Sequence, residues 1–369
     1  MKRIVFNAMI LNDRPTGLGV YCKNILSRID IDKLNHILYI DNYEGRVNTT
    51  KDVVLKFDGS SKMKSILNRN LFMKKWISKQ ENIVHYSPTQ HGVSNKNIKQ
   101  IITVHDLMPL YFPEGRIHQF LYYKLFLKKI IRNSDLVITV SNNTKKDLIK
   151  EYKIKEDKVK VVYNGFDKPE VLDKEESKDI VKDKFGVNDY ILMIGIHYAY
   201  KNLHSVIEAY DLIKDEIDKP IVIVGNDDCK YGNQLKELVK SKGLEDRVLF
   251  LGYVSNEDKN RLYQAAKLFI YPSKYEGFGL PVLEAMANNT LVACSNTSSL
   301  PEVVGDAAIM FNPNSIEDIR DSIKQVYNLT ADEYLKFIEK GNIQISKFSW
   351  DKCASEVERE IISMAQGEV

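Results

Sequence analysis

The sequence predicts an α/β protein built from two doubly wound domains. At 369 residues the chain is longer than one hydrophobic core usually serves. Both halves alternate strand-like apolar runs with helix-like segments, which is the pattern of parallel sheets covered by helices. The alternation restarts after a turn-rich segment, residues 164–169 (Asn-Gly-Phe-Asp-Lys-Pro), so we place the domain boundary near residue 168.

The elements follow in order along each half. In the first half we expect strands at 3–9, 36–41, 83–86, 100–104, 136–140 and 159–162, and helices at 17–29, 62–80, 116–133 and 141–152. In the second half we expect strands near 190–195, 220–224, 247–251, 268–271 and 291–294, and helices near 202–215, 231–242, 256–265 and 280–288. The predicted domains are therefore 1–168 and 169–347. A terminal helix in 348–369 opens at Phe348-Ser349-Trp350.

Composition and cysteine usage indicate a soluble protein of a reducing compartment. Hydrophobic residues make up 44% of the chain and charged residues 28%, as in ordinary globular proteins. No apolar run approaches the roughly 20 residues of a membrane span, and no secretory signal opens the chain. The four cysteines are scattered without C-x-x-C spacing, so neither a disulfide framework nor a zinc site is expected. We expect a cytoplasmic protein.

The charge of the chain is unevenly distributed. Residues 1–170 carry 30 Lys/Arg and 17 Asp/Glu, a net charge of +13, and residues 171–369 carry the remaining 23 and 33, a net charge of −10. A basic first half suggests an anionic partner: nucleic acid, an anionic membrane surface or a phosphorylated lipid. The alternative is a composition rich in lysine with no such partner.

The segment 276–285 (Glu-Gly-Phe-Gly-Leu-Pro-Val-Leu-Glu-Ala) carries the strongest functional signal. It follows a buried-strand run that ends at Pro272, and its glycines let the backbone approach a ligand closely. Pro281 suits the first turn of a helix, whose free N–H groups and dipole favour an anion such as diphosphate. The two glutamates, Glu276 and Glu284, can accept hydrogen bonds from sugar hydroxyls. A diphosphate with a sugar on each side is a nucleotide-sugar; the alternative is an ordinary strand–loop–helix with solvated glutamates.

Two further motifs stand at predicted strand ends. In residues 16–21 (Thr-Gly-Leu-Gly-Val-Tyr), Gly17 and Gly19 form a G-x-G, but Cys22 stands where a dinucleotide-binding loop has its third glycine, which argues against a nicotinamide cofactor. These glycines serve either a phosphate-binding loop or only a tight turn. In the second motif, 104–114, His105 can donate a hydrogen bond to a sugar hydroxyl, although a lone histidine is more often structural. Asp106 is expected to brace the loop.

Taken together, these motifs resemble the retaining glycosyltransferases of family 4, which have the GT-B fold. The segment 276–285 is similar to the E-x7-E signature of that family, and 104–114 (Val-His-Asp-Leu-Met-Pro-Leu-Tyr-Phe-Pro-Glu) is similar to its H-D-L-x-P-L-x-F-P-E stretch. The resemblance spans about 14–352 and is strongest over 250–313. It implies two Rossmann-like domains with the nucleotide-sugar cleft between them, and a terminal helix that crosses back to the first domain.

The resemblance also implies roles for particular residues. Glu276 would contact the donor hexose, Glu284 the ribose, and His105 the donor sugar. Gly17 and Gly19 would lie against the donor phosphates and the acceptor. The resemblance also implies that the backbone at Val254 lies beside the nucleotide base. The loop and helix start would bind the donor through Gly277, Phe278, Gly279 and Leu280.

A lysine loop matches the family only in part. Residues 195–203 (Gly-Ile-His-Tyr-Ala-Tyr-Lys-Asn-Leu) contain the family's Lys-Asn at 201–202, and by this resemblance Lys201 would neutralise the leaving diphosphate. Many members add an arginine just before the lysine or a few residues earlier. Here those places hold Tyr200 and His197, so one cation is missing from the group that stabilises the leaving charge.

Other features limit the possible partners. No metal is expected, because the D-x-D form at Asp30-Ile31-Asp32 ends a predicted helix far from the other motifs. Residues 60–79 and 124–132 interleave basic and apolar side chains, which fits either an interfacial amphipathic helix or a core-facing helix with solvated lysines. An interfacial helix would place the protein peripherally on the inner face of the membrane. Nucleic acid is disfavoured because no recognised binding module accompanies the lysines.

The function predicted from these observations is a retaining, metal-independent glycosyltransferase. It would move a hexose-type sugar from a UDP- or GDP-sugar to a hydroxyl of a glycan or lipid-linked acceptor in bacterial-type surface polysaccharide or glycolipid synthesis. No cofactor is expected, and no cofactor lysine of the phosphorylase type is evident. The alternative is a GT-B protein that binds a nucleotide-sugar but has weak or lost transferase activity, because of the missing arginine.

Overall fold

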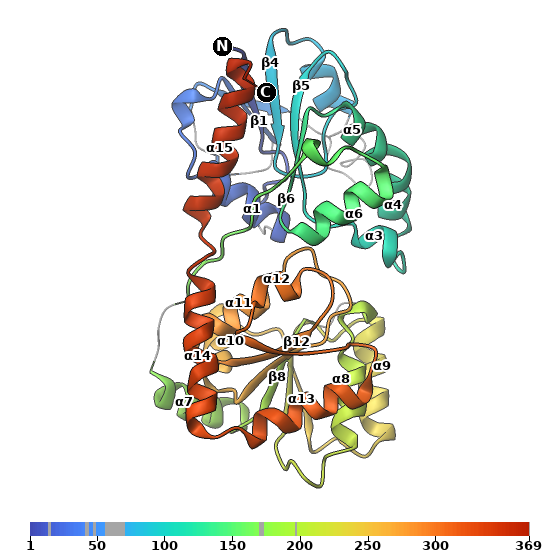
Figure 1. Cartoon of the computed structure of the whole chain (residues 1–369), viewed down its shortest axis with the longest axis vertical. Helices are drawn as coiled ribbons and strands as arrows, with labels where there is room; N and C mark the ends of the chain where they lie inside the picture. The colour runs from blue at the N-terminus through green and yellow to red at the C-terminus, as the bar shows by residue number, and fades with distance from the viewer. Residues whose placement is uncertain are drawn as a thin grey trace. The chain divides into compact units, whose positions relative to one another are not determined.

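The computed structural model describes residues 1–13, 16–40, 44–46, 49–55, 71–169, 173–195 and 198–368. It divides into two compact units, shown in Figure 1. Unit 1 consists of Met1–Gly165 together with Phe348–Val369, and unit 2 is Phe166–Lys347.

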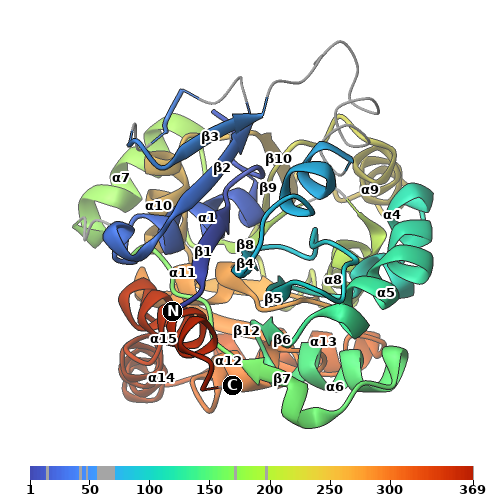
Figure 2. The same ribbon diagram turned by 90° about the horizontal axis from the view of Figure 1, so that it is seen from above.

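Unit 1 contains a parallel sheet of seven strands in the order β3-β2-β1-β4-β5-β6-β7, which Figure 2 shows from above. The strands are β1 Arg3–Asn7, β2 His36–Ile40, β3 Asp52–Leu55, β4 Ile83–Ser87, β5 Lys99–Val104, β6 Leu136–Thr139 and β7 Val159–Val161. Strands β4 and β6 are buried at every residue, as expected when helices cover both faces of a parallel sheet. The strand order turns back between β1 and β4, as in doubly wound folds.

The helices of unit 1 connect its strands, except for α15, which returns to the unit at the end of the chain. They are α1 Gly17–Leu26, α3 Met108–Tyr111, α4 Ile117–Leu121, the π-helix η2 Tyr122–Leu127, α5 Lys128–Asn133, α6 Asn142–Tyr152 and, from the end of the chain, α15 Trp350–Gln366, with short 3₁₀ turns η1 Ile31–Lys33 and η3 Glu156–Lys158. Residues 71–77 are also helical. The expected helix 116–133 is thus three consecutive helical segments with a π turn in the middle.

Unit 2 contains a parallel sheet of six strands in the order β10-β9-β8-β11-β12-β13. Its strands are β8 Ile191–Ile194, β9 Ile221–Val224, β10 Val248–Gly252, β11 Leu268–Tyr271, β12 Leu291–Ser295 and β13 Ala308–Phe311. Its helices are α7 Lys174–Phe185, the 3₁₀ turn η4 Ala199–Lys201, α8 Leu203–Asp211, α9 Lys230–Ser241, α10 Asn256–Ala265, α11 Leu280–Ala287, α12 Leu300–Val304, α13 Ile316–Asn328 and α14 Ala331–Ile345.

The two faces of the unit 2 sheet carry alternate residues of each strand. Ile191, Leu268 and Ile270 belong to the apolar core that α8, α9 and α13 cover. Because side chains alternate along a strand, Phe269 and Tyr271 point to the other face. The ring of Phe269 meets that of Tyr263 in α10 at 5.1 Å between centroids. Figure 1 shows α10, α11 and α14 on this second face and α8, α9 and α13 on the first.

Local sequence signals set the ends of the helices. The side chains of Ser141, Asp173, Ser255 and Ser315 each accept a hydrogen bond from the backbone N–H three residues on, at the N-termini of α6, α7, α10 and α13. Thr330 and Glu333 form a reciprocal capping box at α14. Helix α7 ends at Gly186 with a positive φ of 70°, the left-handed conformation that glycine adopts without strain.

Several elements of the structure were not expected from the sequence. The strands β3 and β13 and the helices α3, α7, α12, α13 and α14 are additions to the predicted set, and part of the predicted helix 62–80 lies outside the described residues. Strands β3 and β13 are four-residue strands at the edges of their sheets, where one partner strand is enough and the apolar run can be short.

The end of the chain belongs to unit 1. Helix α15 packs against α1, β1 and β4, and the N–H of Lys2 donates to Ala365 O at 2.8 Å, so the two chain ends lie side by side (Figures 1 and 2). Gly165 allows this return, because a Cβ there would stand 2.1 Å from the backbone nitrogen of Trp350. Ion pairs between Arg28 and Asp351 and between Lys160 and Glu360 add polar contacts.

Within the part of the chain that the structure describes, no helix is both long enough and apolar enough to cross a membrane.

Candidate functional site

Two of the predicted donor-site residues of unit 2, Lys201 and Glu276, lie at the point where its strand order reverses. Strands β8 and β11 are neighbours in the sheet although they are far apart in sequence. Lys201 lies in the turn η4 after β8, and Glu276 lies in the loop after β11. Ligands of doubly wound sheets bind at this kind of position, beyond the carboxyl ends of the two strands that flank the reversal.

Lys201, Glu276 and Tyr271 form a closed hydrogen-bonded cluster there. The ammonium Nζ of Lys201 donates to Glu276 Oε1 at 2.6 Å and to the Tyr271 hydroxyl at 2.9 Å, and that hydroxyl donates to Glu276 Oε1 at 2.8 Å. The Lys201 and Glu276 side chains are only 18% and 14% exposed. Burial acts to lower the pKa of Lys201, but the carboxylate of Glu276 outweighs it and raises that pKa well above its usual value. Lys201 is therefore a fixed cation.

The loop that carries Glu276 is held by two serines that follow β12. The hydroxyl of Ser298 donates to Glu276 O at 2.6 Å and accepts from Glu276 N at 3.0 Å. The hydroxyl of Ser299 lies within hydrogen-bonding distance of Glu276 O, at 3.0 Å, and of Phe278 O, at 2.7 Å. Ser298 itself has a positive φ of 60°, an uncommon conformation for a residue with a side chain. The backbone of Glu276 is thus fixed on both sides.

Helix α11 begins directly behind this loop at a glycine with positive φ. Gly279 caps the helix with a φ of 116°, and a Cβ at this position would stand 2.8 Å from Leu300 Cδ2. Leu280 is the first helical residue and Pro281 follows it, as predicted for a helix start. Phe278 is buried and Gly277 is partly exposed. The N-terminus of the eight-residue α11 follows the loop that bears Glu276.

Glu284 lies one turn into α11 and has a second lysine and a second tyrosine as partners. Lys259 Nζ, from α10, donates to Glu284 Oε2 at 3.0 Å, and the Tyr263 hydroxyl donates to the same oxygen at 3.3 Å. The Lys259 and Glu284 side chains are 26% and 30% exposed. One oxygen of Glu284 is therefore bound by protein groups, and the side chain remains partly exposed.

Tyr200 occupies the place of the missing arginine and contacts Lys201 in another way. Its ring is buried and stacks on Tyr198 at 5.8 Å between centroids, and Lys201 Nζ lies 5.4 Å from its centroid. A cation above an aromatic ring is attracted by the ring quadrupole. His197, the other candidate for that place, lies outside the described residues. Asn202 is buried and structural, since its amide donates to Pro313 O at 2.8 Å.

Glycines line the strand ends of unit 2 on the side of Val254. Gly195, Gly225 and Gly252, which end or follow β8, β9 and β10, all have positive φ, at 98°, 140° and 65°. Side chains are thereby excluded at three adjacent strand ends, which leaves backbone accessible to a ligand. Val254 is partly buried two residues beyond Gly252, and Tyr253 between them is 86% exposed.

The predicted residues of unit 1 lie in α1, the helix that follows β1, and directly after β5. Helix α1 begins at Gly17, so Gly17 and Gly19 belong to its first turns and not to a loop. Gly17 is exposed and Gly19 is buried. Arg14 and Pro15, which precede this start, lie outside the described residues.

His105 donates through Nε2 to the carbonyl of Pro88 at 2.9 Å, and its ring meets that of Tyr21 edge-on at 4.6 Å. Burial lowers the pKa of His105 to about 4, although the carbonyl of Pro88 opposes this shift. The ring is therefore neutral near pH 7, with its proton on Nε2. A sugar hydroxyl would have to donate to Nδ1, which reverses the direction expected from the sequence.

No three His, Cys, Asp or Glu side chains of the described ranges gather in a way that could hold a metal ion. The D-x-D form has a local role, because the carboxylate of Asp30 accepts from the N–H of Asp32 at 3.0 Å and caps η1.

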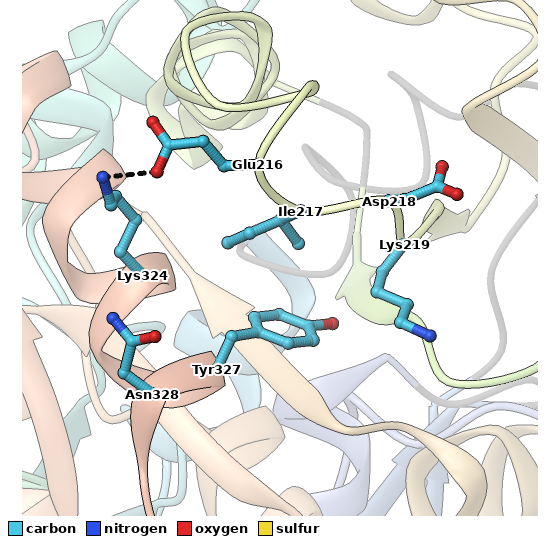
Figure 3. A pocket seen from close by; sticks show the side chains of 7 residues that line it. All are labelled: Glu216, Ile217, Asp218, Lys219, Lys324, Tyr327 and Asn328. Carbon is cyan, nitrogen blue, oxygen red and sulfur yellow. Dashed lines mark ion pairs between the residues drawn. The ribbon is translucent and has the colours of Figure 1, made fainter.

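Figure 3 shows a pocket of about 280 Å³ in unit 2, away from these residues. Its lining comes from the segment before β9 and from α13, and Lys324 pairs with Glu216 at 2.6 Å across it. Because Lys219 precedes β9, this pocket lies at the amino-terminal end of the strand, opposite the edge where Lys201 and Glu276 lie. It is not the predicted donor site.

Apart from Lys201, the side chains that bind the two glutamates were not predicted from the sequence. Tyr271 is the last residue of an otherwise apolar strand, and a hydroxyl at that position was the available signal. Lys259 and Tyr263 are four residues apart on α10 and therefore share one helix face. Their relation to Glu284 depends on how α10 packs against α11, which no short motif encodes.

Residues 173–344 match the family described as glycosyl transferases group 1, and residues 47–168 match glycosyltransferase family 4. The chain is 32% identical over 252 residues to the O-antigen chain mannosyltransferase RfbU of Salmonella typhimurium, covering 68% of this chain and 66% of the relative. It is 32% identical over 271 residues to the O-antigen chain mannosyltransferase B of Escherichia coli, covering 70% and 68%. The chain thus spans about two thirds of the length of these relatives.

The crystal structure of a glycosyltransferase from Rickettsia africae superposes with a TM-score of 0.71 at 21% identity, covering 98% of this chain and 99% of that one. The expected GT-B fold is confirmed by this likeness and by the two parallel α/β units.

Proposed function

The chain belongs to the family 4 glycosyltransferases, the glycosyl transferases group 1, and from this premise we propose that it transfers a hexose from a nucleoside diphosphate sugar to a hydroxyl group with retention at the anomeric carbon. The acceptor is a growing glycan or a lipid-linked sugar of surface polysaccharide synthesis. The names of the two O-antigen relatives favour mannose as the transferred hexose.

One observation carries this proposal: the buried cluster of Lys201, Tyr271 and Glu276 at the reversal of strand order, directly before the N-terminus of α11. It places a fixed cation and a carboxylate within 2.6 Å of each other beside a helix start. The cation and the helix start suit a diphosphate, and the carboxylate suits a sugar hydroxyl.

Each group has a distinct task in the proposed reaction. Lys201 has three N–H donors, and within the described ranges Glu276 and Tyr271 take two of them, so we assign the third to a phosphate oxygen. Its charge stabilises the negative charge that develops on the leaving diphosphate. Glu276 orients the hexose hydroxyls and Glu284 holds the ribose. His105 accepts a hydrogen bond from a sugar hydroxyl through Nδ1.

The bonds change without a covalent enzyme intermediate. The bond between the anomeric carbon and the diphosphate oxygen breaks, and the acceptor oxygen bonds to the same face of that carbon. The acceptor proton passes to the departing diphosphate. The protein supplies positioning and charge, and no divalent metal is required because Lys201 and the amides of the Gly277–Leu280 segment offset the diphosphate charge.

A thermal-shift panel of UDP-, GDP-, ADP- and dTDP-sugars, including nucleotide-linked mannose, tests the donor site. A ligand present at a hundredfold excess over its dissociation constant stabilises the fold by about 2.7 kcal/mol. We expect one nucleotide class to raise the melting temperature and Lys201→Ala and Glu284→Ala to lose the response. Lys340→Ala, which removes a lysine paired with Asp306 elsewhere in unit 2, is the matched control. No response to any nucleotide contradicts the proposal.

The second candidate is a nucleotide-sugar-binding protein without transferase activity. The observation that favours it is Tyr200, which contributes no charge where the family often has arginine. Turnover separates the two: release of nucleoside diphosphate that depends on a mannose-terminated acceptor supports the enzyme. If the wild type binds the donor without releasing nucleoside diphosphate, and Tyr200→Arg restores this release, the protein is a binding protein.

We further propose that the enzyme works on the surface of an anionic membrane and contacts it through the segment 117–133 of unit 1. Four large apolar side chains are exposed there, Ile117 at 56%, Leu121 at 44%, Leu125 at 61% and Phe126 at 57%. Lys124, Lys128, Lys129 and Arg132 are exposed beside them. No acidic residue occurs in the sequence between Glu114 and Asp135. Basic side chains next to exposed apolar ones match anionic headgroups above an acyl layer.

Co-sedimentation with vesicles tests this surface. We expect binding to phosphatidylglycerol-containing vesicles and not to phosphatidylcholine alone. Each lysine near the surface contributes roughly 1 kcal/mol, so Lys124→Glu with Lys128→Glu should weaken binding by more than about tenfold. Leu125→Asp with Phe126→Asp should abolish it. The control variant Lys146→Glu with Lys150→Glu on α6 makes the same charge change. It should bind vesicles better than the variant at Lys124 and Lys128, and equal loss of binding in both variants would refute a specific surface.

A further inference from the structure

Both glutamates of the predicted donor site are held in the same way, although they lie on different elements. Glu276 Oε1 accepts from Lys201 Nζ and from the Tyr271 hydroxyl, at 2.6 and 2.8 Å. Glu284 Oε2 accepts from Lys259 Nζ and from the Tyr263 hydroxyl, at 3.0 and 3.3 Å. In each case one lysine and one tyrosine bind the same carboxylate oxygen.

The two tyrosines are rigid. Tyr263 and Tyr271 are 0% and 3% exposed. The ring of Phe269 joins them, edge-on to Tyr263 at 5.1 Å and stacked on Tyr271 at 5.7 Å between centroids. Burial raises the pKa of each hydroxyl, and the neighbouring glutamate raises it further, so both phenols stay protonated and act as donors. A protonated hydroxyl fixed by packing determines the direction from which it meets the carboxylate.

The other oxygen of each carboxylate is left for a ligand. Among the described residues, no protein group donates to Glu276 Oε2 or Glu284 Oε1. A carboxylate oxygen has two lone-pair directions and accepts readily from an aliphatic hydroxyl. With one oxygen bound by lysine and tyrosine, the carboxylate cannot rotate, and its second oxygen faces a single direction. The geometry suits recognition of one set of sugar hydroxyls at each glutamate.

We propose that Tyr263 and Lys259 position Glu284 for the ribose hydroxyls of the donor nucleotide, and that Tyr271 positions Glu276 and Lys201 for the hexose and the diphosphate. These are positioning residues and do not touch the substrate. The inference rests on the proposed donor site. Its consequence is that the two tyrosines control different parts of one ligand, Tyr263 the nucleoside end and Tyr271 the end that reacts.

Binding of paired nucleotides tests the nucleoside end. The dissociation constant of the nucleoside diphosphate that stabilises the wild type is measured by calorimetry, alongside that of its 2′,3′-dideoxy analogue. The ratio of the two constants reports only the ribose hydroxyls. The free energy of a hydrogen bond to a charged group corresponds to about a tenfold change in a dissociation constant. Tyr263→Phe or Lys259→Met should therefore reduce this ratio by about tenfold. Lys259→Arg keeps the positive charge, so most of the wild-type ratio should be retained.

Controls separate positioning from general loss of stability. Tyr210→Phe removes a buried hydroxyl that donates to Lys219 O at 2.8 Å, and it should leave the ratio unchanged. Lys340→Met removes another paired lysine of unit 2 and should also leave it unchanged. Tyr271→Phe should keep the ribose ratio and lower kcat for sugar transfer by about tenfold.

The outcomes distinguish this inference from the proposed function. A wild-type protein that binds no nucleoside diphosphate overturns both. Nucleotide binding with a wild-type ratio near one, or a ratio that Tyr263→Phe and Lys259→Met both leave intact, overturns the inference and leaves the donor site standing. A ratio reduced equally by Tyr271→Phe also overturns it, because the two tyrosines would then not act on separate ends of the ligand.

Discussion

At the scale of single residues, two histidines of unit 1 are kept neutral by their surroundings. Burial lowers the pKa of His85 to about 4, although a hydrogen bond from its Nδ1 to the Gln100 side chain, at 3.0 Å, opposes the shift. His105 has the same depressed pKa for the same reason. In the unfolded chain both would titrate near 6.5. Their protonation is thus coupled to the stability of the fold.

The sign of this coupling follows from proton counting. Between about pH 6.5 and 4 the unfolded chain binds more protons than the folded one, so stability is full above the unfolded pKa and falls as pH decreases. Each histidine should lower the free energy of unfolding by about 2 kcal/mol when the pH falls from 7 to 5. We expect His85→Gln to reduce the loss measured by denaturant unfolding at these two pH values. A variant whose stability falls as steeply as that of the wild type would contradict the assignment.

Most of the candidate residues could be named from sequence, but their contacts could not. Lys201 and Glu276 each follow an apolar strand and stand in a short motif, so they were expected in a diphosphate and sugar site. Their 2.6 Å ion pair depends on β8 lying beside β11, which joins residues 75 positions apart. Lys259 and Tyr263 were missed because nothing near them in the sequence refers to Glu284.

At the scale of elements, the start of α11 depends on one glycine. Gly279 has a φ of 116°, and a Cβ there would meet Leu300 Cδ2 at 2.8 Å. Gly186 provides a matched control, because its φ of 70° is also positive but nothing lies within 4 Å of its missing Cβ. An alanine at a positive φ costs about 1 kcal/mol or more by backbone strain alone. The close contact adds to this cost only at Gly279.

We therefore expect Gly279→Ala to lower the free energy of unfolding of unit 2 by more than Gly186→Ala, and to weaken nucleotide binding. Leu300→Ala in the same chain should relieve the contact but not the backbone strain, and so recover part of the affinity. Denaturant unfolding and calorimetric titration measure the two effects. If both alanine variants lose the same stability and both bind nucleotide normally, the helix start has no role in the donor site.

Element prediction succeeded where the signals were local. Helix α10 has its predicted bounds, because Ser255 caps it and an apolar strand follows. The segment 116–133 was expected as one α-helix, but a π turn occupies its middle, and periodicity alone does not distinguish a π turn from an α-helix over six residues. Strand β13 was missed because it is short and partly exposed at the sheet edge.

At the scale of the whole molecule, the last helix of the chain completes the first unit. Helix α15 buries Trp350, Val357 and Ile361, each less than 5% exposed, and packs against α1, β1 and β4. Each fully buried side chain of this size contributes about 1.5–3 kcal/mol, and the total stability of a domain is about 5–15 kcal/mol. The three residues alone are therefore a large part of what unit 1 can lose before it unfolds.

A chain that ends at Lys347 should separate the two units in hydrogen exchange. Without α15, amides of β1 and β4 should lose protection, because the apolar faces they share with it are exposed to water. Amides of β8 and β11 should keep theirs and gain more when nucleotide is added, because unit 2 has its own core and the predicted donor site. Gly165→Ala in the full chain should act in the same direction, since its Cβ would stand 2.1 Å from Trp350 N and displace the start of α15. Protection of β1 and β4 that survives the truncation would mean that α15 adds little to unit 1. Loss of protection in both units would mean that unit 2 cannot fold without it.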